Sequence, residues 1–291
     1  MSISCLKGRF FVRNLGYYNG KIGLIEEMSV PMNDRAGYFG DGIYDATYSR
    51  NHIIYALDEH IERFFNSARL VGMEVPMSRE ALAELLCDLV RRVDDGEQFV
   101  YWQLTRGTAP RNHAFPGVPP NLWVMLKPAS VKDTYAPVQL ITAEDTRFYH
   151  CNIKTLNLLP NVLAAQRAEA AGAQESVFHR GDRVTECAHS NVHIIRDETF
   201  ITAPTDNLIL PGIARAHLIR TARALGYAVE ERPFTVSEMM DADEVMISSA
   251  GSFCLAATEI DGKPVGGKSP VMLRRLQDAL VEDWLSKTTP K

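Results

Sequence analysis

Helix-like and strand-like segments come in pairs in the first half of the chain, and this order most constrains the fold. Apolar residues at helical spacing predict two consecutive helices, for which Asp58 and Ser78 are suitable N-caps. Two strand-like runs follow with no helix between them. These four segments are residues 58–72, 78–93, 99–105 and 122–127. Because strands and helices do not alternate strictly, an α+β fold is favoured over a doubly wound parallel sheet.

The rest of the chain adds further elements and a boundary. Strand-like runs lie at 23–32 and 43–56, around a loop at 33–42, and at 138–143, 175–179, 192–195, 199–203, 227–232 and 244–249, before a hairpin around "EIDGKPV". Helices are predicted through about Ala171, from "LPGIAR" to Gly226, after Thr235 and from Ser269 and Pro270. Residues 128–137, "PASVKDTYAP", are expected to be a linker. It divides an N-terminal α/β domain, 1–127, from a C-terminal domain, 138–291.

Composition excludes several classes of protein. Hydrophobic residues make up 46% and charged residues 23% of the 291 residues, which is typical of a globular protein. The net charge of −5 gives no reason to expect nucleic acid or an anionic membrane as a partner. Apolar runs are strand-sized and no signal peptide is visible, so we expect a cytoplasmic protein without membrane spans. Scattered cysteines predict reduced thiols and no metal site: Cys5, Cys87, Cys151, Cys187 and Cys254.

One lysine stands in an apolar, amide-rich stretch. Residues 150–166, "HCNIKTLNLLPNVLAAQ", contain Lys154 and no acidic residue. The simpler interpretation is a lysine whose stem packs on the core while its ammonium group reaches water. The alternative is a partly desolvated amine that acts as a Schiff-base nucleophile. Taken alone, the stretch favours the simpler interpretation.

Three other motifs could carry chemistry, and each also has an ordinary structural interpretation. "LPGIAR" places Pro-Gly before a helix, so the N–H groups of Ile213 and Ala214 could bind an anion, or the motif could merely form a turn. Glu186 is a carboxylate isolated among small and uncharged residues, or an ordinary strand-end residue. Arg111 and His113 lie in a polar loop, where they could bind a carboxylate or simply be solvated.

A lysine, a carboxylate and an anion-binding helix N-terminus together suit pyridoxal 5'-phosphate. This cofactor needs an amine for its aldehyde, a carboxylate for its ring nitrogen and donors for its phosphate. The residues alone therefore suggest this cofactor without placing the three motifs together in space.

The chain also resembles the fold type IV pyridoxal-phosphate aminotransferases, and among them the bacterial D-amino-acid aminotransferases. The resemblance runs from about Tyr18 to the final helix and is carried, in the family's order, by "NDRAGYFGDGIYD", "DEHIERFFNSA", "YWQLTRGTAPRNHAFP", "NIKTLNLLPNVLAAQ", "VTE" and "ILPGIAR". The lysine segment and "TRGTAPRNHAF" are its most specific parts. The second separates the D-amino-acid enzymes from their branched-chain relatives. The resemblance implies a two-domain α+β fold.

It also implies a reaction and roles for individual residues. The reaction would be transamination between a D-amino acid such as D-alanine and a 2-oxo acid such as 2-oxoglutarate. Lys154 would form the Schiff base with the cofactor and move the proton of the substrate's α-carbon, and Glu186 would face the ring nitrogen. The phosphate would be bound by Arg63, by the N–H groups of Ile213 and Ala214, and by the hydroxyls of Ser248 and Ser249. The substrate carboxylate would be bound by Tyr44, Arg111 and His113, the last two donated by the partner in a homodimer.

Three departures from the family pattern stand out. Cys187, Ala188 and His189 follow the glutamate where the family has a glycine and serines. Ala214 stands where threonine is frequent, which removes one hydroxyl from the phosphate site. The segment 248–258, "SSAGSFCLAAT", matches poorly and is one residue longer. These departures bear on the hydrogen bonds of the ring, on cofactor affinity and on the pocket for the substrate side chain.

Rival functions remain open at this point. An (R)-selective amine transaminase or a branched-chain L-amino-acid aminotransferase would share Lys154 and Glu186, but Arg111 with His113 argues against both. An aminodeoxychorismate-type lyase would use the same cofactor without an amino acceptor. Outside the enzymes, the chain could bind the cofactor without turnover.

Overall fold

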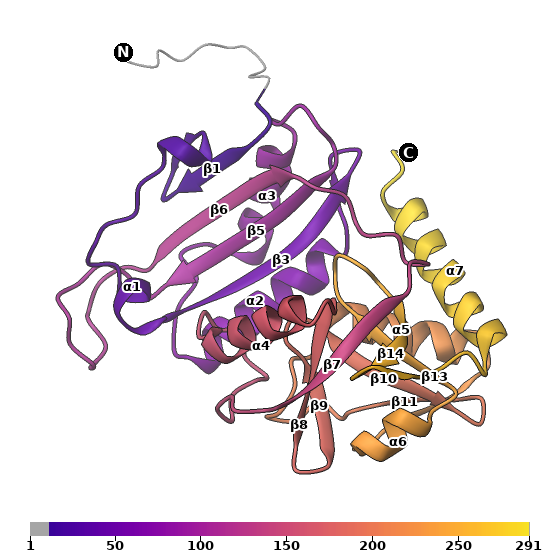
Figure 1. The fold of residues 1–291 in the computed structure, drawn as a ribbon. Helices are drawn as coiled ribbons and strands as arrows, with labels where there is room; N and C mark the ends of the chain where they lie inside the picture. Colours follow the sequence, from indigo (N-terminus) through magenta and orange to yellow (C-terminus); the bar gives the residue numbers. More distant parts are fainter. Residues whose placement is uncertain (1–11, 291) are drawn as a thin grey trace. The chain divides into compact units, whose positions relative to one another are not determined.

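The computed structural model describes residues 12–290, and the chain divides into two compact units (Figure 1). Unit 1 comprises Met1–Ser130 with Lys287–Lys291, and unit 2 comprises Val131–Ser286. The division falls inside the stretch 128–137 that was expected to be a linker, while the last residues group with unit 1. No helix within residues 12–290 has both the length and the apolar character needed to cross a membrane. Four cysteines in this range are free thiols, and Cys5 lies outside it.

Unit 1 is built on an antiparallel sheet with the strand order β2-β1-β6-β5-β3-β4. The strands are β1 (Leu15–Tyr18), β2 (Lys21–Gly23), β3 (Gly42–Arg50), β4 (Ile53–Ile54), β5 (Gln98–Thr105) and β6 (Asn121–Pro128). The helices are the 3-10 turn η1 (Ile25–Glu27), α1 (Arg35–Phe39), α2 (Leu57–Leu70) and α3 (Arg79–Val90). Helices α2 and α3 lie along one face of this sheet (Figure 1).

Strand alternation creates the core of unit 1. Successive side chains of a strand point to opposite faces, so Val100, Trp102 and Leu104 of β5 all point to one face and are buried there. The Trp102 ring meets Phe64 of α2 with ring centroids 6.0 Å apart. Ser78 caps α3 as predicted, accepting a hydrogen bond from Ala81 N at 3.2 Å. The pattern of helix and strand residues therefore predicted this layer well.

Three details of unit 1 differ from the expectations. Asp58 is not the cap of α2, because the helix begins one residue earlier and Ala56 occupies the N-cap position without a side-chain hydrogen bond. The expected loop 33–42 contains α1, whose cap is Asp34, accepting from Ala36 N at 2.8 Å. The expected strand at 23–32 is mostly the turn η1 and coil, because Met28 folds back onto β1. A Cβ added to Gly16 would lie 2.6 Å from Met28 Cγ.

Unit 2 contains a mixed sheet in the order β12-β11-β10-β13-β14-β7-β8-β9, with β15 paired to β14. The strands are β7 (Val138–Glu144), β8 (Glu175–Arg180), β9 (Arg183–Cys187), β10 (Asn191–Arg196), β11 (Thr199–Thr202), β12 (Ala228–Glu231), β13 (Glu244–Ser248), β14 (Leu255–Ile260) and β15 (Lys263–Pro264). The helices are α4 (Leu159–Ala170), α5 (Ile213–Ala224), α6 (Val236–Asp241) and α7 (Pro270–Lys287). The expected α+β class is confirmed.

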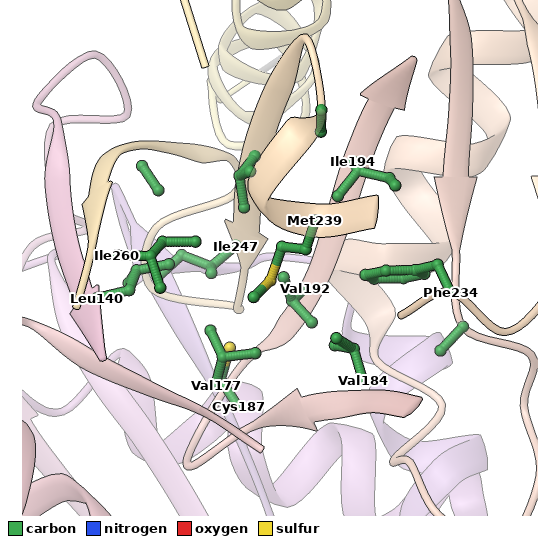
Figure 2. Close-up of a cluster of buried hydrophobic side chains, with 14 of the residues drawn as sticks. Leu140, Val177, Val184, Cys187, Val192, Ile194, Phe234, Met239, Ile247 and Ile260 are labelled. Carbon is green, nitrogen blue, oxygen red and sulfur yellow. The ribbon is translucent and has the colours of Figure 1, made fainter. Parts of the chain in front are cut away.

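Most strands of unit 2 contribute to one hydrophobic cluster (Figure 2). Val184 of β9 and Ile201 of β11 lie near opposite ends of the strand order, yet both belong to it. The sheet therefore curls around this cluster. Met239 of α6 also points into it (Figure 2). A capping box between Thr235 and Glu238 sets the start of α6. The curled sheet brings the ends of β9, β10 and β13 close to one another.

The sequence pattern missed one strand of unit 2. β9 carries Glu186, but the small and polar residues around it gave no alternating signal. Its pairing with β8 and the burial of both faces, rather than local propensity, make it a strand.

Candidate active site

Glu186 lies near the end of β9 and is buried. Its Oε1 accepts a hydrogen bond from Arg147 Nη1. Its Oε2 accepts from Asn191 Nδ2 and from Leu210 N, both at 3.0 Å. The donors come from three separate segments, so the carboxylate is held in one orientation.

The same environment changes how readily Glu186 ionises. Burial raises its pKa to about 7, against the opposing effects of Arg147, the Leu210 N–H group and the charge of Lys154. Lys154 is half-buried in the coil between β7 and α4, and its effect on Glu186 places the amine within electrostatic reach of the carboxylate. The stretch 150–166 contains no acidic residue, and Glu186 lies on β9, a strand distant from it in sequence.

Asp145 and Arg147 were not predicted from the sequence as site residues. Arg147 donates to Glu186 and is itself held by Asp145. The Arg147 guanidinium donates to Asp145 Oδ1 through Nε and to Asp145 Oδ2 through Nη2, both at 2.9 Å. Burial opposes the charge of Arg147, but hydrogen bonds to Asp145 and the charge of Glu186 raise its pKa. Arg180 Nε also donates to Asp145 at 3.1 Å. The available signal was an acid and a base two residues apart directly after an apolar strand.

Asn191 connects this carboxylate to the start of α5. Its Nδ2 donates to Glu186 Oε2 and to Leu210 O, both at 3.0 Å. A Cβ added to Gly212 would overlap with Asn191 Oδ1. Gly212 is the N-cap of α5 and provides no side-chain hydrogen bond. The first N–H groups of this helix, at Ile213 and Ala214, therefore begin directly beside the Glu186 network, where a helix N-terminus favours an anion.

Ser248, at the end of β13, is held by a buried histidine. His193 Nε2 lies 2.8 Å from Ser248 Oγ, and Nδ1 lies 2.8 Å from Thr202 Oγ1. Burial, together with the charge of Arg215, lowers the pKa of His193 to about 3, so the imidazole is neutral. The neighbouring Ser249 Oγ lies 2.8 Å from Ser252 Oγ. Both serines predicted to bind phosphate thus sit in hydrogen-bonded positions.

The three residues after Glu186 that depart from the family pattern lie in different environments. Cys187 belongs to the hydrophobic cluster of unit 2, and Ala188 packs beneath α4. His189 Nδ1 lies 2.7 Å from Oε2 of the buried Glu175, while 59% of its own side chain is exposed. Ser190 Oγ donates to the same oxygen at 3.0 Å. The imidazole is therefore paired with Glu175, and the thiol is part of the core.

In unit 1, Arg63 of α2 is held by a buried acid. Its Nε donates to Asp45 Oδ2 at 2.8 Å and its Nη2 to Asp45 Oδ1 at 2.7 Å. His60 Nδ1 lies 2.8 Å from the same Asp45 Oδ1. Burial opposes the charge of Asp45, but Arg63 and His60 lower its pKa below the usual range. Arg63 is thus a fixed cation, with 9% of its side chain exposed.

The three residues predicted to bind the substrate carboxylate also lie in unit 1. Tyr44 is on β3 and stacks on Tyr101 with centroids 5.3 Å apart. Arg111 and His113 are exposed in the loop between β5 and β6, and both contact the ring of Phe39 in α1. The structure therefore brings Arg111 and His113 together on one aromatic side chain.

The arrangement in unit 2 fits pyridoxal phosphate. It offers an amine near a buried carboxylate, and that carboxylate is tied through Asn191 to a helix N-terminus without a side-chain cap. The raised pKa of Glu186 means that burial outweighs the charge of Arg147, so a protonated ring nitrogen beside the carboxylate would stabilise its ionised form.

Comparisons with known proteins agree with this arrangement. The family model for amino-transferase class IV matches residues 42–260. The chain is 39% identical over 265 residues to D-alanine aminotransferase of Listeria monocytogenes serotype 1/2a (strain 10403S), covering 89% of this chain and 92% of that protein. It is 37% identical over 278 residues to D-alanine aminotransferase of Bacillus licheniformis, covering 93% and 97%.

Solved structures agree as well. The fold is similar to that of a branched-chain amino acid aminotransferase from T.th. with pyridoxamine 5'-phosphate, with a TM-score of 0.87 and 26% identity over 95% of this chain and 96% of that one. With a family model that matches most of its length and relatives of this identity, the chain belongs to the class IV aminotransferases.

Proposed function

We propose that this aminotransferase uses pyridoxal 5'-phosphate to transfer the amino group of a D-amino acid, D-alanine foremost, to a 2-oxo acid such as 2-oxoglutarate. The observation that carries the proposal is the pairing of Arg111 and His113 on the Phe39 ring, which presents a guanidinium and an imidazole to a carboxylate. The identity to D-alanine aminotransferases over about nine-tenths of the chain supports it.

In unit 2, Lys154 would bind the cofactor's aldehyde carbon and transfer the proton at the substrate's α-carbon. Glu186 would hold a proton at the ring nitrogen, and Arg147 with Asn191 would keep the carboxylate aimed there. When bound, the cofactor supplies an electron sink for the charge that develops at the α-carbon. The N–H groups of Ile213 and Ala214 and the hydroxyls of Ser248 and Ser249 would bind the phosphate.

In unit 1, Arg63 would add a fixed positive charge for the phosphate. Tyr44, Arg111 and His113 would bind the substrate's carboxylate and so decide which enantiomer turns its α-hydrogen toward Lys154. A guanidinium that binds both oxygens of a carboxylate makes this choice geometrically strict.

We also propose that the enzyme is a cytoplasmic homodimer in which the loop 106–117 contributes to the partner's active site. The exposed Arg111, His113 and Phe115 at the loop tip support an interface. The free thiols in the described range are compatible with a reducing compartment.

The test is turnover of D-alanine with 2-oxoglutarate, followed as pyruvate, beside the same assay with L-alanine. We expect a strong preference for D-alanine. Arg111→Ala should lower kcat/KM for D-alanine at least about tenfold and affect amines without a carboxylate much less, since a lost charge-assisted contact costs about 2–5 kcal/mol when desolvated. A preference for L-alanine would refute the proposal and favour a branched-chain or amine-specific enzyme.

A further inference from the structure

Phe39, the last residue of α1, is the contact that Arg111 and His113 share. The Arg111 Cζ atom lies 5.0 Å from the centroid of the Phe39 ring. The His113 ring centroid lies 5.0 Å from it, with the ring planes inclined at 46°. Arg35 Cζ approaches the same ring at 5.0 Å. One half-buried aromatic ring thus contacts two exposed side chains and one buried cation.

Arg35 holds the backbone of the same loop. Its Nη1 donates to Asn112 O at 2.5 Å and its Nη2 to His113 O at 3.4 Å. Its Nε donates to Asp41 Oδ2 at 2.8 Å. Because these three bonds use all the nitrogen atoms of a planar group, the loop carbonyls and Asp41 are held in one plane. The backbone that carries Arg111 and His113 is therefore tied to α1.

Arg106 anchors the loop from its other side. Its Nε lies 2.9 Å from both oxygens of Asp41. Its Nη1 and Nη2 donate to Gly72 O and Val71 O, at 3.1 and 2.8 Å. Its Cζ lies 3.6 Å from the ring centroid of Phe115, a side chain that is 68% exposed. The exposed tip of the loop is thus fixed by two buried arginines that share Asp41.

We propose that Phe39 and Arg35 are positioning residues for recognition of the substrate's carboxylate. Phe39 restricts the Arg111 and His113 side chains to the arrangement that binds a carboxylate, and Arg35 fixes the backbone between them. An exposed arginine otherwise loses much rotamer freedom when it binds, and prior contact with an aromatic ring reduces that loss. This inference rests on the proposed function, since it requires Arg111 and His113 to bind a carboxylate.

The principal measurement is binding of propionate, a carboxylate without an amino group, to the holoenzyme by calorimetry. Phe39→Leu should weaken propionate binding about fivefold, the scale of losing cation–π contacts at exposed side chains. Phe39→Tyr, which keeps the ring, should restore it. Arg35→Lys keeps the charge near Asp41 but loses the fork of donors, so it should weaken binding as well.

Kinetics with D-alanine give a second readout. KM should rise in Phe39→Leu by a similar factor, with kcat and cofactor affinity within about twofold of wild type, because the reacting atoms are untouched. The matched control is Phe65→Leu. The Phe65 ring is also half-buried, and Arg79 Cζ lies 4.7 Å from its centroid. Phe65 lies outside this loop. Phe65→Leu should leave propionate binding unchanged.

Each outcome decides the proposal. Unchanged propionate binding in Phe39→Leu, equal losses in Phe39→Tyr and Phe39→Leu, or no propionate binding by wild type would overturn it. If wild type binds propionate in a Phe39-dependent manner but does not turn over D-alanine, the proposed function fails and the positioning role stands.

Discussion

At the scale of single residues, Glu186 combines burial with three protein hydrogen bonds, from Arg147, Asn191 and Leu210. Substituting Glu186 with alanine should leave the cofactor bound, because phosphate and lysine contacts remain. Turnover should fall by about two orders of magnitude or more, the scale of losing one preorganised electrostatic contact. The measurement is kcat for D-alanine beside the cofactor content of the purified variant. Near wild-type turnover would show that another group serves the ring nitrogen.

Glu186→Gln is the control for that experiment. It keeps the size of the side chain and an oxygen for the Leu210 N–H group, but not the charge. A loss equal to that of Glu186→Ala would assign the effect to charge and not to a cavity.

The lowered pKa of His193 predicts how the stability of the protein depends on pH. Its pKa falls from the usual 6.5 to about 3 in the folded state. Between these values the unfolded chain binds more protons, so the free energy of unfolding should fall as pH is lowered through this window. From pH 6.5 to 5 the loss is about 1.6 kcal/mol, because the slope rises from half of 1.36 kcal/mol per pH unit at pH 6.5 to nearly the full value at pH 5. Urea unfolding at both pH values measures this loss as the difference between wild type and His193→Phe in how the free energy of unfolding changes with pH.

Glu186 changes the free energy of unfolding in the opposite direction over this pH range. Its contribution must therefore be distinguished from that of His193. Its pKa rises from 4.5 to about 7, so between these values the folded state binds more protons and the free energy of unfolding falls as pH rises. The difference between wild type and His193→Phe cancels this contribution. Identical pH dependence in the two proteins would contradict a neutral His193.

At the scale of elements, the start of α5 depends on the absence of one side chain. Gly212 has φ −66°, which alanine adopts readily, so an effect of Gly212→Ala would come from overlap with Asn191 alone. Displacing Asn191 removes one hydrogen bond from Glu186 and shifts the helix N-terminus. We expect a stability loss of about 1–3 kcal/mol and cofactor binding weakened about tenfold. Equilibrium titration of the apoenzyme with pyridoxal phosphate measures the second effect.

A glycine elsewhere provides the comparison. A Cβ added to Gly23, at the end of β2, would make only ordinary contacts, the nearest with Met28 Sδ at 3.4 Å. Gly23→Ala should therefore bind the cofactor like wild type. If both variants bind pyridoxal phosphate as tightly as each other, the close approach of Gly212 to Asn191 does not require a glycine.

At the scale of the whole molecule, the proposed homodimer makes activity dependent on concentration. If the loop 106–117 completes the partner's site, dilution below the dimer dissociation constant should abolish turnover. The rate per subunit, measured from micromolar to picomolar enzyme beside the sedimentation coefficient, checks this. A monomer that turns over D-alanine at the full rate would exclude a shared site.

Much of the architecture follows from local pattern. Ser78 and the apolar spacing after it specified α3, Pro211 and Gly212 marked the start of α5, and strand-like runs indicated β5 and β6. These features depend on neighbours within a few residues, so they can be read without the fold. The motifs around Lys154 and Arg111 likewise indicated the family, which the comparisons confirm.

The sequence by itself thus determined the class of fold, most helices and strands, and the family. Only the tertiary structure decided that Asp145 and Arg147 support Glu186, that the charge of Lys154 lowers the pKa of that carboxyl group, and that Phe39 contacts both Arg111 and His113. The physical reason is that burial and charge coupling depend on which distant segments meet. β7 and β9 lie on either side of β8 in the sheet, and α1 meets the loop after β5 through Arg35, so no local pattern encodes these contacts.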